Sequence, residues 1–329
     1  MLDLVAIQPD LGGRLEAELA RVAEVFDRQL ASDLTAVNEL CEHVGRFRGK
    51  MLRPTLVLLS GAAAAGDAGE SLGEPHRLLA ATVEMIHMAT LVHDDVLDEA
   101  EVRRRGSTIN SLWGNEAAVM LGDYLISNAF HLCSRIRDPE VNLALGRVTN
   151  TLCAGELLQL AHRGDHGLDE ATYLEIIRRK TASLIAECCR LGARMTGGDE
   201  VVAGALHEAG VELGVAFQVQ DDILDLTGET ATIGKSAGRD LDKGKLTLPL
   251  ILHLADRDTT ARARTLELVE RGEHRALAAV LAEHGAIDAA ARRARHHVER
   301  AIAAIGRVPD GPATRLLTVL AWRIVDRDH

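Results

Sequence analysis

Two acidic clusters with the pattern DDxxD are the residues of this sequence best suited to chemistry. They are Asp94, Asp95 and Asp98 in the first cluster, and Asp221, Asp222 and Asp225 in the second. Each follows an apolar stretch with helical periodicity, Ala80–Val92 or Val211–Val219, so we expect each at the C-terminal end of a helix. On a helix, the first and last aspartates of a cluster share a face. Two such helices predict a cavity with carboxylates on opposite walls.

The aspartates indicate a metal ion. Three carboxylates this close repel one another, and the helix dipole disfavours anions at a C-terminus. A multivalent cation offsets both costs, and oxygen ligands favour Mg²⁺, which takes one or two carboxylates together with substrate phosphates. An exposed acidic helix end would explain one cluster, but two clusters in apolar sequence favour the metal. The unit Glu84-x-x-His87 is typical of di-iron bundles, but the second unit that such a site needs is absent.

Basic residues near glycine or acidic features indicate where phosphates would bind. They are Lys50 and Arg53 in GKMLRP, Arg103–Arg105, Lys180 before Thr181, and Lys235 and Lys245 in a glycine-rich segment. We expect Pro54 to start a helix whose N-terminus is flanked by Lys50 and Arg53, which is a natural anion site. The glycine-rich segment lacks the pattern GxxxxGK[ST], so a nucleotide-binding P-loop is not supported.

The composition indicates a helical globular protein. The chain has 329 residues, of which 47% are hydrophobic and only 2% aromatic, which disfavours an all-β fold. Apolar residues recur at helical spacing along almost the whole chain, and no linker divides it. We therefore predict an all-α fold, with a single domain over residues 1–329 that contains ten or more helices.

Charge and cysteine content exclude several classes of protein. A formal net charge of −12 argues against a nucleic-acid partner. Five cysteines without a CxxC pattern predict neither a disulfide framework nor a zinc site, and favour a reducing, cytoplasmic location. The first residues lack a secretory pattern. The longest apolar run, Leu56–Gly66, is about half of the ~20 residues that span a membrane, so we expect no membrane span.

At these residues the sequence resembles the trans-isoprenyl diphosphate synthases, the polyprenyl synthetase family, and in particular its medium- and long-chain members. The shared motifs run in order over about residues 45–250: GKMLRP (49–54), EMIHMATLVHDDVLDEAEVRR (84–104), GDYL (122–125), GELLQ (155–159), KT (180–181), FQVQDDILD (217–225) and GKSAGRDLDKGKLTLP (234–249). The resemblance implies an all-α isoprenoid synthase fold, a central cavity between the two Asp-bearing helices, and a homodimer. It also implies condensation of an allylic diphosphate, such as farnesyl or geranylgeranyl diphosphate, with isopentenyl diphosphate.

The resemblance further implies a role for each matching residue. The six aspartates would hold Mg²⁺, expected as three ions, on the allylic diphosphate. The same diphosphate would contact Arg103, Lys180, Lys235 and Lys245. Isopentenyl diphosphate would bind Lys50, Arg53, His87 and Arg104. Thr181 and Gln218 would line the reacting centre. Because the chain has three successive arginines where many members have two, the assignment of each arginine to one diphosphate stays open.

The length of the product follows from the helix before the first motif. Thr82, Ile86 and Ala89 form one stripe on this helix. Short-chain members of the family carry a bulky aromatic residue five positions before the first aspartate, where this chain has Ala89, followed by Thr90. We therefore expect that no bulky side chain closes the product cavity at this helix, and that the product is C20 or longer, with C30–C40 favoured. Such an apolar product could be delivered to the membrane. Alternatively, Ala89 is small only because two helices pack closely there.

Two other functions stay open at this point. A terpene cyclase would use the same ionisation, but it would not need Lys50, Arg53 and His87 for a second diphosphate, and the low aromatic content disfavours it. A partner subunit without activity of its own could lose its aspartates, whereas all six are present.

Overall fold

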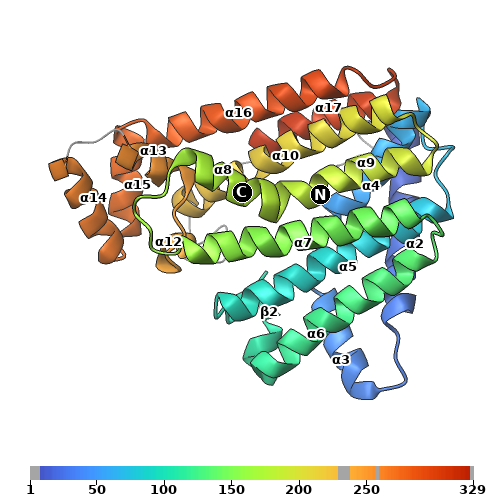
Figure 1. Cartoon of the computed structure of the whole chain (residues 1–329), viewed down its shortest axis with the longest axis horizontal. Helices are drawn as coiled ribbons and strands as arrows, with labels where there is room; N and C mark the ends of the chain where they lie inside the picture. Colours follow the sequence, from blue (N-terminus) through green and yellow to red (C-terminus); the bar gives the residue numbers. More distant parts are fainter. Residues whose placement is uncertain (1–7, 105, 229–237, 256–258, 327–329) are drawn as a thin grey trace. The chain divides into compact units, whose positions relative to one another are not determined.

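The computed structural model describes residues 8–104, 106–228, 238–255 and 259–326. These residues are almost entirely helical, so the predicted all-α fold with ten or more helices is confirmed (Figure 1). They group into two compact units, each made of three separate stretches of the chain. The first unit comprises Met1–Thr149, Glu187–His207 and Ile305–Leu317, and the second comprises Asn150–Ala186, Glu208–Ala304 and Thr318–His329. A single domain stays a prediction.

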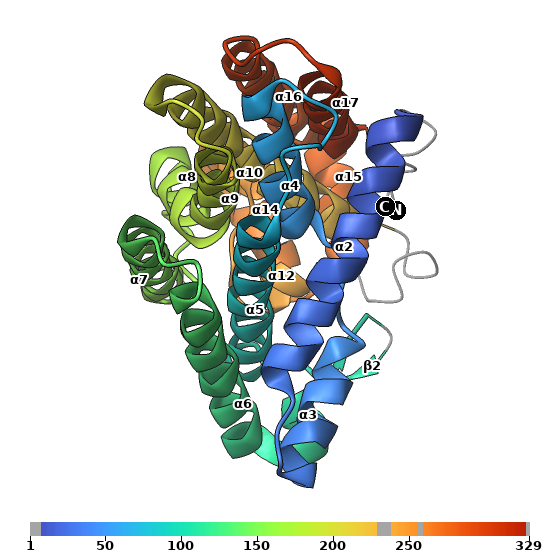
Figure 2. The ribbon, with the colours of Figure 1, turned by 90° about the vertical axis from the view of Figure 1, so that its right-hand side faces the viewer.

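The first unit is built around α5 (Glu74–Leu97). Its residues from Leu78 to Ile86 are buried without a break, because α5 has neighbours on several sides. The neighbours are α2 (Pro9–Leu30), α4 (Leu52–Ala65) and, most extensively, α6 (Ile109–Ser134), against which α3 (Thr35–Gly45) also packs. Figure 2 shows α5 and α6 side by side. The helix that carries the first aspartate motif is therefore held rigidly along most of its length.

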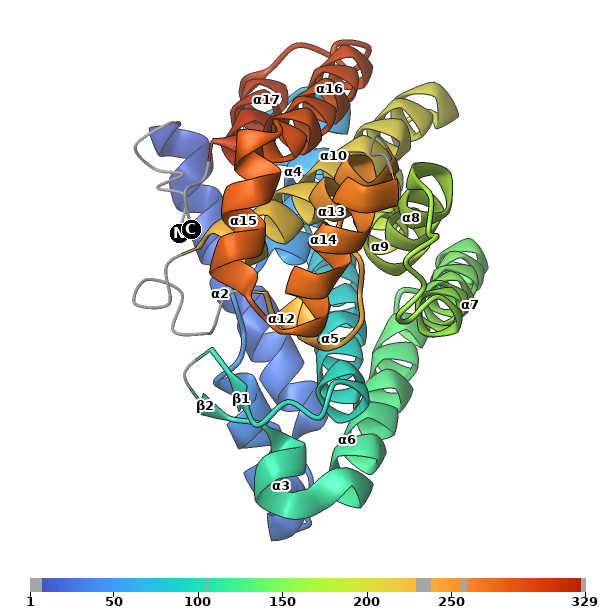
Figure 3. The same cartoon turned by 90° about the vertical axis from the view of Figure 1, so that its left-hand side faces the viewer.

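A short hairpin follows α5 (Figure 3). Strand β1 (Val102–Arg103) pairs antiparallel with β2 (Gly106–Ser107). The buried Thr108 comes next, and its hydroxyl donates to the carbonyl oxygen of Ala100 at 2.6 Å while it caps α6. The hairpin thereby folds Arg103 back toward the end of α5.

The second unit contains the helix that carries the other aspartate motif. Its elements are part of α7 (Pro139–Ala161), α8 (Glu170–Ile177), the π-helical turn η1 (Arg178–Ala182), the start of α9 (Ser183–Met195), most of α10 (Glu200–Thr227), α12 (Arg239–Asp242), α13 (Leu248–Ala255), α14 (Thr259–Glu270), α15 (His274–Glu283), α16 (Ala286–Ile305) and the end of α17 (Pro312–Val325). One hydrophobic core joins α8, α10, α13 and α15 through residues such as Tyr173, Val219, Leu250 and Leu277. The buried Glu212 of α10 contacts two residues of α16, the buried His297 and the exposed Arg300, and this joins the two helices.

The π-helical turn η1 interrupts an otherwise continuous helix from Glu170 to Met195. Glycines on two other helices make this turn possible, because they let the backbones approach closely. A Cβ atom at Gly155 of α7 would lie 2.7 Å from the backbone nitrogen of Lys180, and one at Gly214 of α10 would lie 2.4 Å from Cα of Ala182. Such turns occur frequently at functional sites.

No helix among the described residues is both long enough and apolar enough to cross a membrane.

The close approach at Gly155 leads to a prediction on stability. Gly155→Ala should lower the free energy of unfolding by about 1–3 kcal/mol, because the new methyl group meets backbone atoms that cannot move aside. Gly146→Ala on the same helix is the matched control, since a Cβ atom there meets nothing within 4 Å, and it should gain up to about 1 kcal/mol. Urea denaturation followed by circular dichroism measures both. Equal stability of the two variants would contradict the close approach.

Candidate functional site

The first aspartate motif occupies the end of α5. Asp94 and Asp98 are partly exposed, and Asp98 ends the helix, with its backbone N–H donating to the carbonyl oxygen of Asp94 at 2.8 Å. Asp95 is buried at 4% exposure and pairs with Arg103. Nε of Arg103 lies 2.9 Å from both carboxylate oxygens of Asp95, and Nη2 lies 2.8 Å from Oδ1. The protein therefore neutralises the middle carboxylate itself, and solvent reaches the outer two.

Arg104 brings a second positive charge to the loop before α4. It has a positive φ of 47°, and its Nη1 donates to the carbonyl oxygen of Phe47. A Cβ atom at Gly49 would lie 2.5 Å from Nη1 of Arg104, so the guanidinium lies directly against this glycine. The structure thus brings the GKMLRP segment and the arginines after the first motif together, as the proposed isopentenyl diphosphate site requires.

The helix after this loop begins earlier than the sequence suggested. Met51 has a left-handed conformation with φ of 52°, and α4 starts at Leu52, so the predicted start at Pro54 is wrong by two residues. Proline is tolerated there because the first backbone N–H groups of a helix have no partner within it. Arg53 therefore lies within the first turn of α4 and not before it, and Lys50 is exposed in the preceding loop.

Glu84 is a buried acidic residue of α5 that lies near the arginine cluster. It is only 2% exposed, and burial raises the pKa of its carboxyl, which the positive charges of Arg53, Arg104 and Arg48 oppose. Three arginines around Glu84 disfavour a metal cation there, which argues against the di-iron alternative.

His87 lies one helical turn after Glu84 on α5. Burial lowers the pKa of His87 well below its ordinary value, and the charges of Arg53, Arg104 and Arg103 lower it further. The imidazole is therefore neutral at pH 7. In this form it can donate a hydrogen bond to a phosphate oxygen without adding a positive charge.

The residues predicted to set the product length lie on the same helix. Thr82, Ile86 and Ala89 are completely buried, and Thr90 is partly buried with its hydroxyl donating to the carbonyl oxygen of His87 at 2.8 Å. The stripe therefore belongs to the interior of the first unit. Its contact with a product stays a prediction.

The second aspartate motif lies in the last two turns of α10 and repeats the arrangement of the first. Asp222 is buried at 4% exposure, whereas Asp221 and Asp225 are partly exposed. Asp222 accepts hydrogen bonds from the hydroxyl of Tyr173 at 2.6 Å and from Nε2 of Gln218 at 2.9 Å. Burial and the neighbouring charge of Asp240 raise the pKa of Asp222 to about 8, although both hydrogen bonds oppose the increase.

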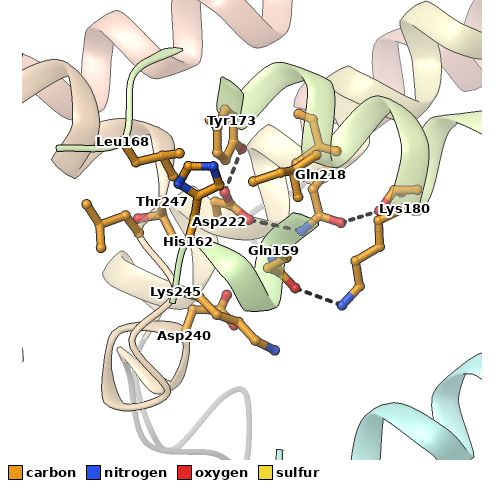
Figure 4. Close-up of a pocket in the computed structure, with 14 residues that line it drawn as sticks. Gln159, His162, Leu168, Tyr173, Lys180, Gln218, Asp222, Asp240, Lys245 and Thr247 are labelled. Atoms are coloured by element: carbon orange, nitrogen blue, oxygen red, sulfur yellow. Dashed lines mark hydrogen bonds between the residues drawn. The ribbon is translucent and has the colours of Figure 1, made fainter. Parts of the chain in front are cut away.

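A pocket in the second unit brings together several of the residues singled out from the sequence (Figure 4). It is lined by Lys180 and Thr181 of η1, Gln218 and Asp222 of α10, and Lys245, along with Gln159, His162, Tyr173, Asp240 and Thr247. The buried hydroxyl of Thr247 has no hydrogen-bond partner among the residues that the structure describes. Lys235 lies outside the described residues.

Lys180 is oriented by the helix that carries GELLQ. Its ammonium donates to Oε1 of Gln159 at 3.0 Å and pairs with Glu156. Thr181, the next residue in the π-helical turn, donates from its hydroxyl to Oε1 of Gln218 at 2.9 Å. The π-helical turn therefore holds a lysine and a hydroxyl group at the same pocket.

The aspartate motifs fit Mg²⁺ that is shared with a phosphate ligand. Within the described ranges, no three His, Cys, Asp or Glu side chains gather closely enough to hold a metal ion by themselves. Mg²⁺ does not require such a cluster, because it keeps waters and takes phosphate oxygens beside one or two carboxylates. The outer aspartates of each motif offer that set of donors.

Sequence reasoning missed the contacts of four residues at these sites: Tyr173, Glu84 near the arginines, and Glu156 and Gln159 beside Lys180. A signal for Tyr173 was available. It is one of two tyrosines in the chain and lies seven residues before Lys180, which places both on one face of a helix. A tyrosine buried in this position needs a partner for its hydroxyl.

Comparison with known proteins gives matches along almost the whole chain. A family model described as polyprenyl synthetase matches residues 35–283. The octaprenyl diphosphate synthase of Haemophilus influenzae is 32% identical, with 99% of each chain covered. Heptaprenyl diphosphate synthase component 2 of Geobacillus stearothermophilus is 34% identical over 96% of this chain and 97% of that protein.

The fold also matches solved structures. The polyprenyl synthase of Caulobacter crescentus, solved in complex with calcium and isoprenyl diphosphate, has a TM-score of 0.90 and 34% identity, with 98% of each chain covered.

Proposed function

Because the chain belongs to the polyprenyl synthetase family and is a chain-elongating prenyltransferase, we propose that it condenses an allylic diphosphate with isopentenyl diphosphate to a product of C30–C40. The observation that carries this proposal is the repeated aspartate motif. In each motif the middle carboxylate is held by the protein and the outer two are partly exposed, with basic residues nearby. This is the arrangement that a cation-bound diphosphate requires.

The first step of the proposed reaction is ionisation of the allylic diphosphate. Mg²⁺ at the two aspartate motifs, expected as three ions, would neutralise the charge that develops on the leaving diphosphate as its C–O bond breaks. Lys180 and Lys245 line the pocket of the second unit and would add positive charge to the same group. Arg103 and Lys235 are further candidates, although Arg103 pairs with Asp95.

The second step joins the two substrates. Lys50, Arg53 and Arg104 would hold the diphosphate of isopentenyl diphosphate, and the neutral His87 would donate a hydrogen bond to it. Holding the two substrates together makes the attack of the double bond on the allylic cation effectively unimolecular. Loss of a proton, most simply to the released diphosphate, then gives a product longer by five carbons. The chain itself need not supply a nucleophile.

The proposed length of the product agrees with the names of relatives, which include heptaprenyl and octaprenyl diphosphate synthases. The small side chains of Ala89 and Thr90 support a long product, because neither would block a growing chain at this turn of α5.

A homodimer is also proposed. Helix α6 exposes several large apolar side chains: Leu112, Trp113, Val119 and Met120. Monomeric proteins rarely leave such a patch in contact with water, and a second copy of the chain would cover it. Analytical ultracentrifugation tests this point, and a monomer at micromolar concentration would contradict it. A cytoplasmic location stays a prediction from the sequence.

The two proposed diphosphate sites make opposite predictions for the Michaelis constants. The assay uses purified chain, Mg²⁺, farnesyl diphosphate and labelled isopentenyl diphosphate, with the products separated by length. Lys50→Ala or Arg53→Ala should raise the KM for isopentenyl diphosphate by about tenfold or more, because each removes a charge-assisted hydrogen bond. Lys245→Ala should raise mainly the KM for the allylic substrate.

Two results would contradict these assignments. If all three substitutions raise the KM for both substrates equally, the assignment of two separate diphosphate sites is wrong. No incorporation of label by the wild type would remove the proposed function itself. The chain is assayed alone because one relative is named as component 2 of its synthase, and an active single chain would exclude an inert partner subunit.

The length of the product is tested by Ala89→Phe. Each turn of α5 advances about 5.4 Å, on the order of one isoprene unit, so a ring at Ala89 should stop growth near C15. Condensation with the primer should continue, and short products should accumulate in the same assay. If the variant makes the same chain length as the wild type, the product cavity is closed elsewhere and Ala89 is small only for helix packing.

A further inference from the structure

Three hydrogen bonds in series connect α8, α10 and η1 in the second unit (Figure 4). The hydroxyl of Tyr173 donates to Oδ2 of Asp222 at 2.6 Å. The amide nitrogen of Gln218 donates to Oδ1 of Asp222 at 2.9 Å. The hydroxyl of Thr181 donates to the amide oxygen of Gln218 at 2.9 Å. We call these four residues the Tyr173 chain.

The orientation of the Gln218 amide sets the direction of two of these bonds. Its NH₂ group faces Asp222 and its carbonyl oxygen faces the hydroxyl of Thr181. The proton of the Thr181 hydroxyl is then used in the bond to Gln218, and its oxygen lone pairs stay available to the pocket. The orientation of two groups in the pocket therefore depends on where Asp222 is held.

Tyr173 is the residue that holds Asp222 from the opposite helix. Both side chains are 4% exposed, and the tyrosine ring belongs to the hydrophobic core of the unit. Burial and the charge of Asp222 raise the pKa of Tyr173 well above its ordinary value, so the hydroxyl keeps its proton and stays a donor. Phenylalanine would keep the packing and leave Oδ2 of Asp222 without this donor.

We propose that Tyr173 is a positioning residue for the reaction, because it anchors Asp222 and thereby orients the Gln218 amide and the Thr181 hydroxyl. Asp222, with both oxygens taken by protein donors, serves this purpose rather than acting as a direct cation ligand. The inference rests on the proposed function, in which Thr181 and Gln218 line the reacting centre. It adds a residue that acts on the reacting centre through Asp222.

The test is a double-mutant cycle of Tyr173→Phe and Gln218→Ala. Tyr173→Phe alone should lower kcat by about tenfold or more, since small displacements at a reacting centre are costly. In the Gln218→Ala background the same change should lower kcat by less than about twofold, because the chain is already broken. The KM for isopentenyl diphosphate should not change, and saturating Mg²⁺ should not restore kcat.

Tyr124→Phe is the matched control. It removes the same single oxygen from the chain's other tyrosine, on α6 in the first unit, and should leave kcat within about twofold of the wild type in either background. The equilibrium constant of unfolding in urea is also measured for the wild type, both single variants and the double variant. This measurement does not depend on activity. The double variant should change this equilibrium constant by a smaller factor than the product of the factors for Tyr173→Phe and Gln218→Ala alone.

Asp222→Asn keeps the proposal testable if Tyr173→Phe does not fold. Asparagine offers one acceptor oxygen instead of two, so either Tyr173 or Gln218 loses its bond. The kcat of Asp222→Asn should fall even at saturating Mg²⁺. The loss should again be smaller in the Gln218→Ala background than in the wild-type background. Recovery of kcat at high Mg²⁺ would instead make Asp222 a cation ligand and overturn the proposal.

Two further outcomes separate this proposal from the one on which it rests. If the wild type is active, two results would overturn the role of Tyr173 alone. One is a kcat of Tyr173→Phe within twofold of the wild type. The other is an equal loss of kcat from this change in the wild-type and Gln218→Ala backgrounds. A wild type that incorporates no label would overturn the proposed function and the catalytic part of this inference. The unfolding cycle would still report on the Tyr173 chain, and additive effects there would overturn the chain itself.

Discussion

Each aspartate motif depends on one buried carboxylate that the protein itself holds. Asp95 is held by Arg103, and Asp222 is held by Tyr173 and Gln218. An unpaired carboxylate at such depth would be costly, and these partners reduce the cost. The held carboxylate fixes the end of its helix, and the neighbouring aspartates keep contact with solvent. Cation binding can then use the outer aspartates without disturbing the core.

The placement of positive charge follows the same constraint. A chain with a net charge of −12 can bind diphosphates only where cations gather locally. In the first unit the arginines near GKMLRP lie close to the buried Glu84, and their charges oppose the effect of burial on the pKa of its carboxyl. In the second unit Lys180 is oriented by Glu156 and Gln159, which are both partly buried. Acidic and amide side chains from the helices thus lie beside the basic groups.

Much of the fold and part of the candidate site could be predicted from the sequence. Helical periodicity gave the all-α fold and the position of both aspartate motifs near the ends of α5 and α10. The order of the motifs gave the family, and Lys180, Thr181 and Gln218 do meet in one pocket. Lys235 could not be compared, because it lies outside the described residues.

Other features depend on tertiary contacts that local sequence does not encode. The π-helical turn requires the close approach of Gly155 and Gly214 from other helices. The start of α4 at Leu52 depends on the left-handed Met51, which no propensity favours. The pairing of Arg103 with Asp95 requires the hairpin after α5.

The central claim is that cations bound at the outer aspartates drive ionisation of the allylic diphosphate. The most direct measurement is the turnover of labelled isopentenyl diphosphate, at increasing Mg²⁺, by the wild type, Asp94→Ala and Asp221→Ala. Both variants should lose turnover by about a thousandfold, comparable to about 4 kcal/mol of transition-state stabilisation, while their helical circular dichroism stays unchanged. Turnover close to that of the wild type in either folded variant would contradict the account.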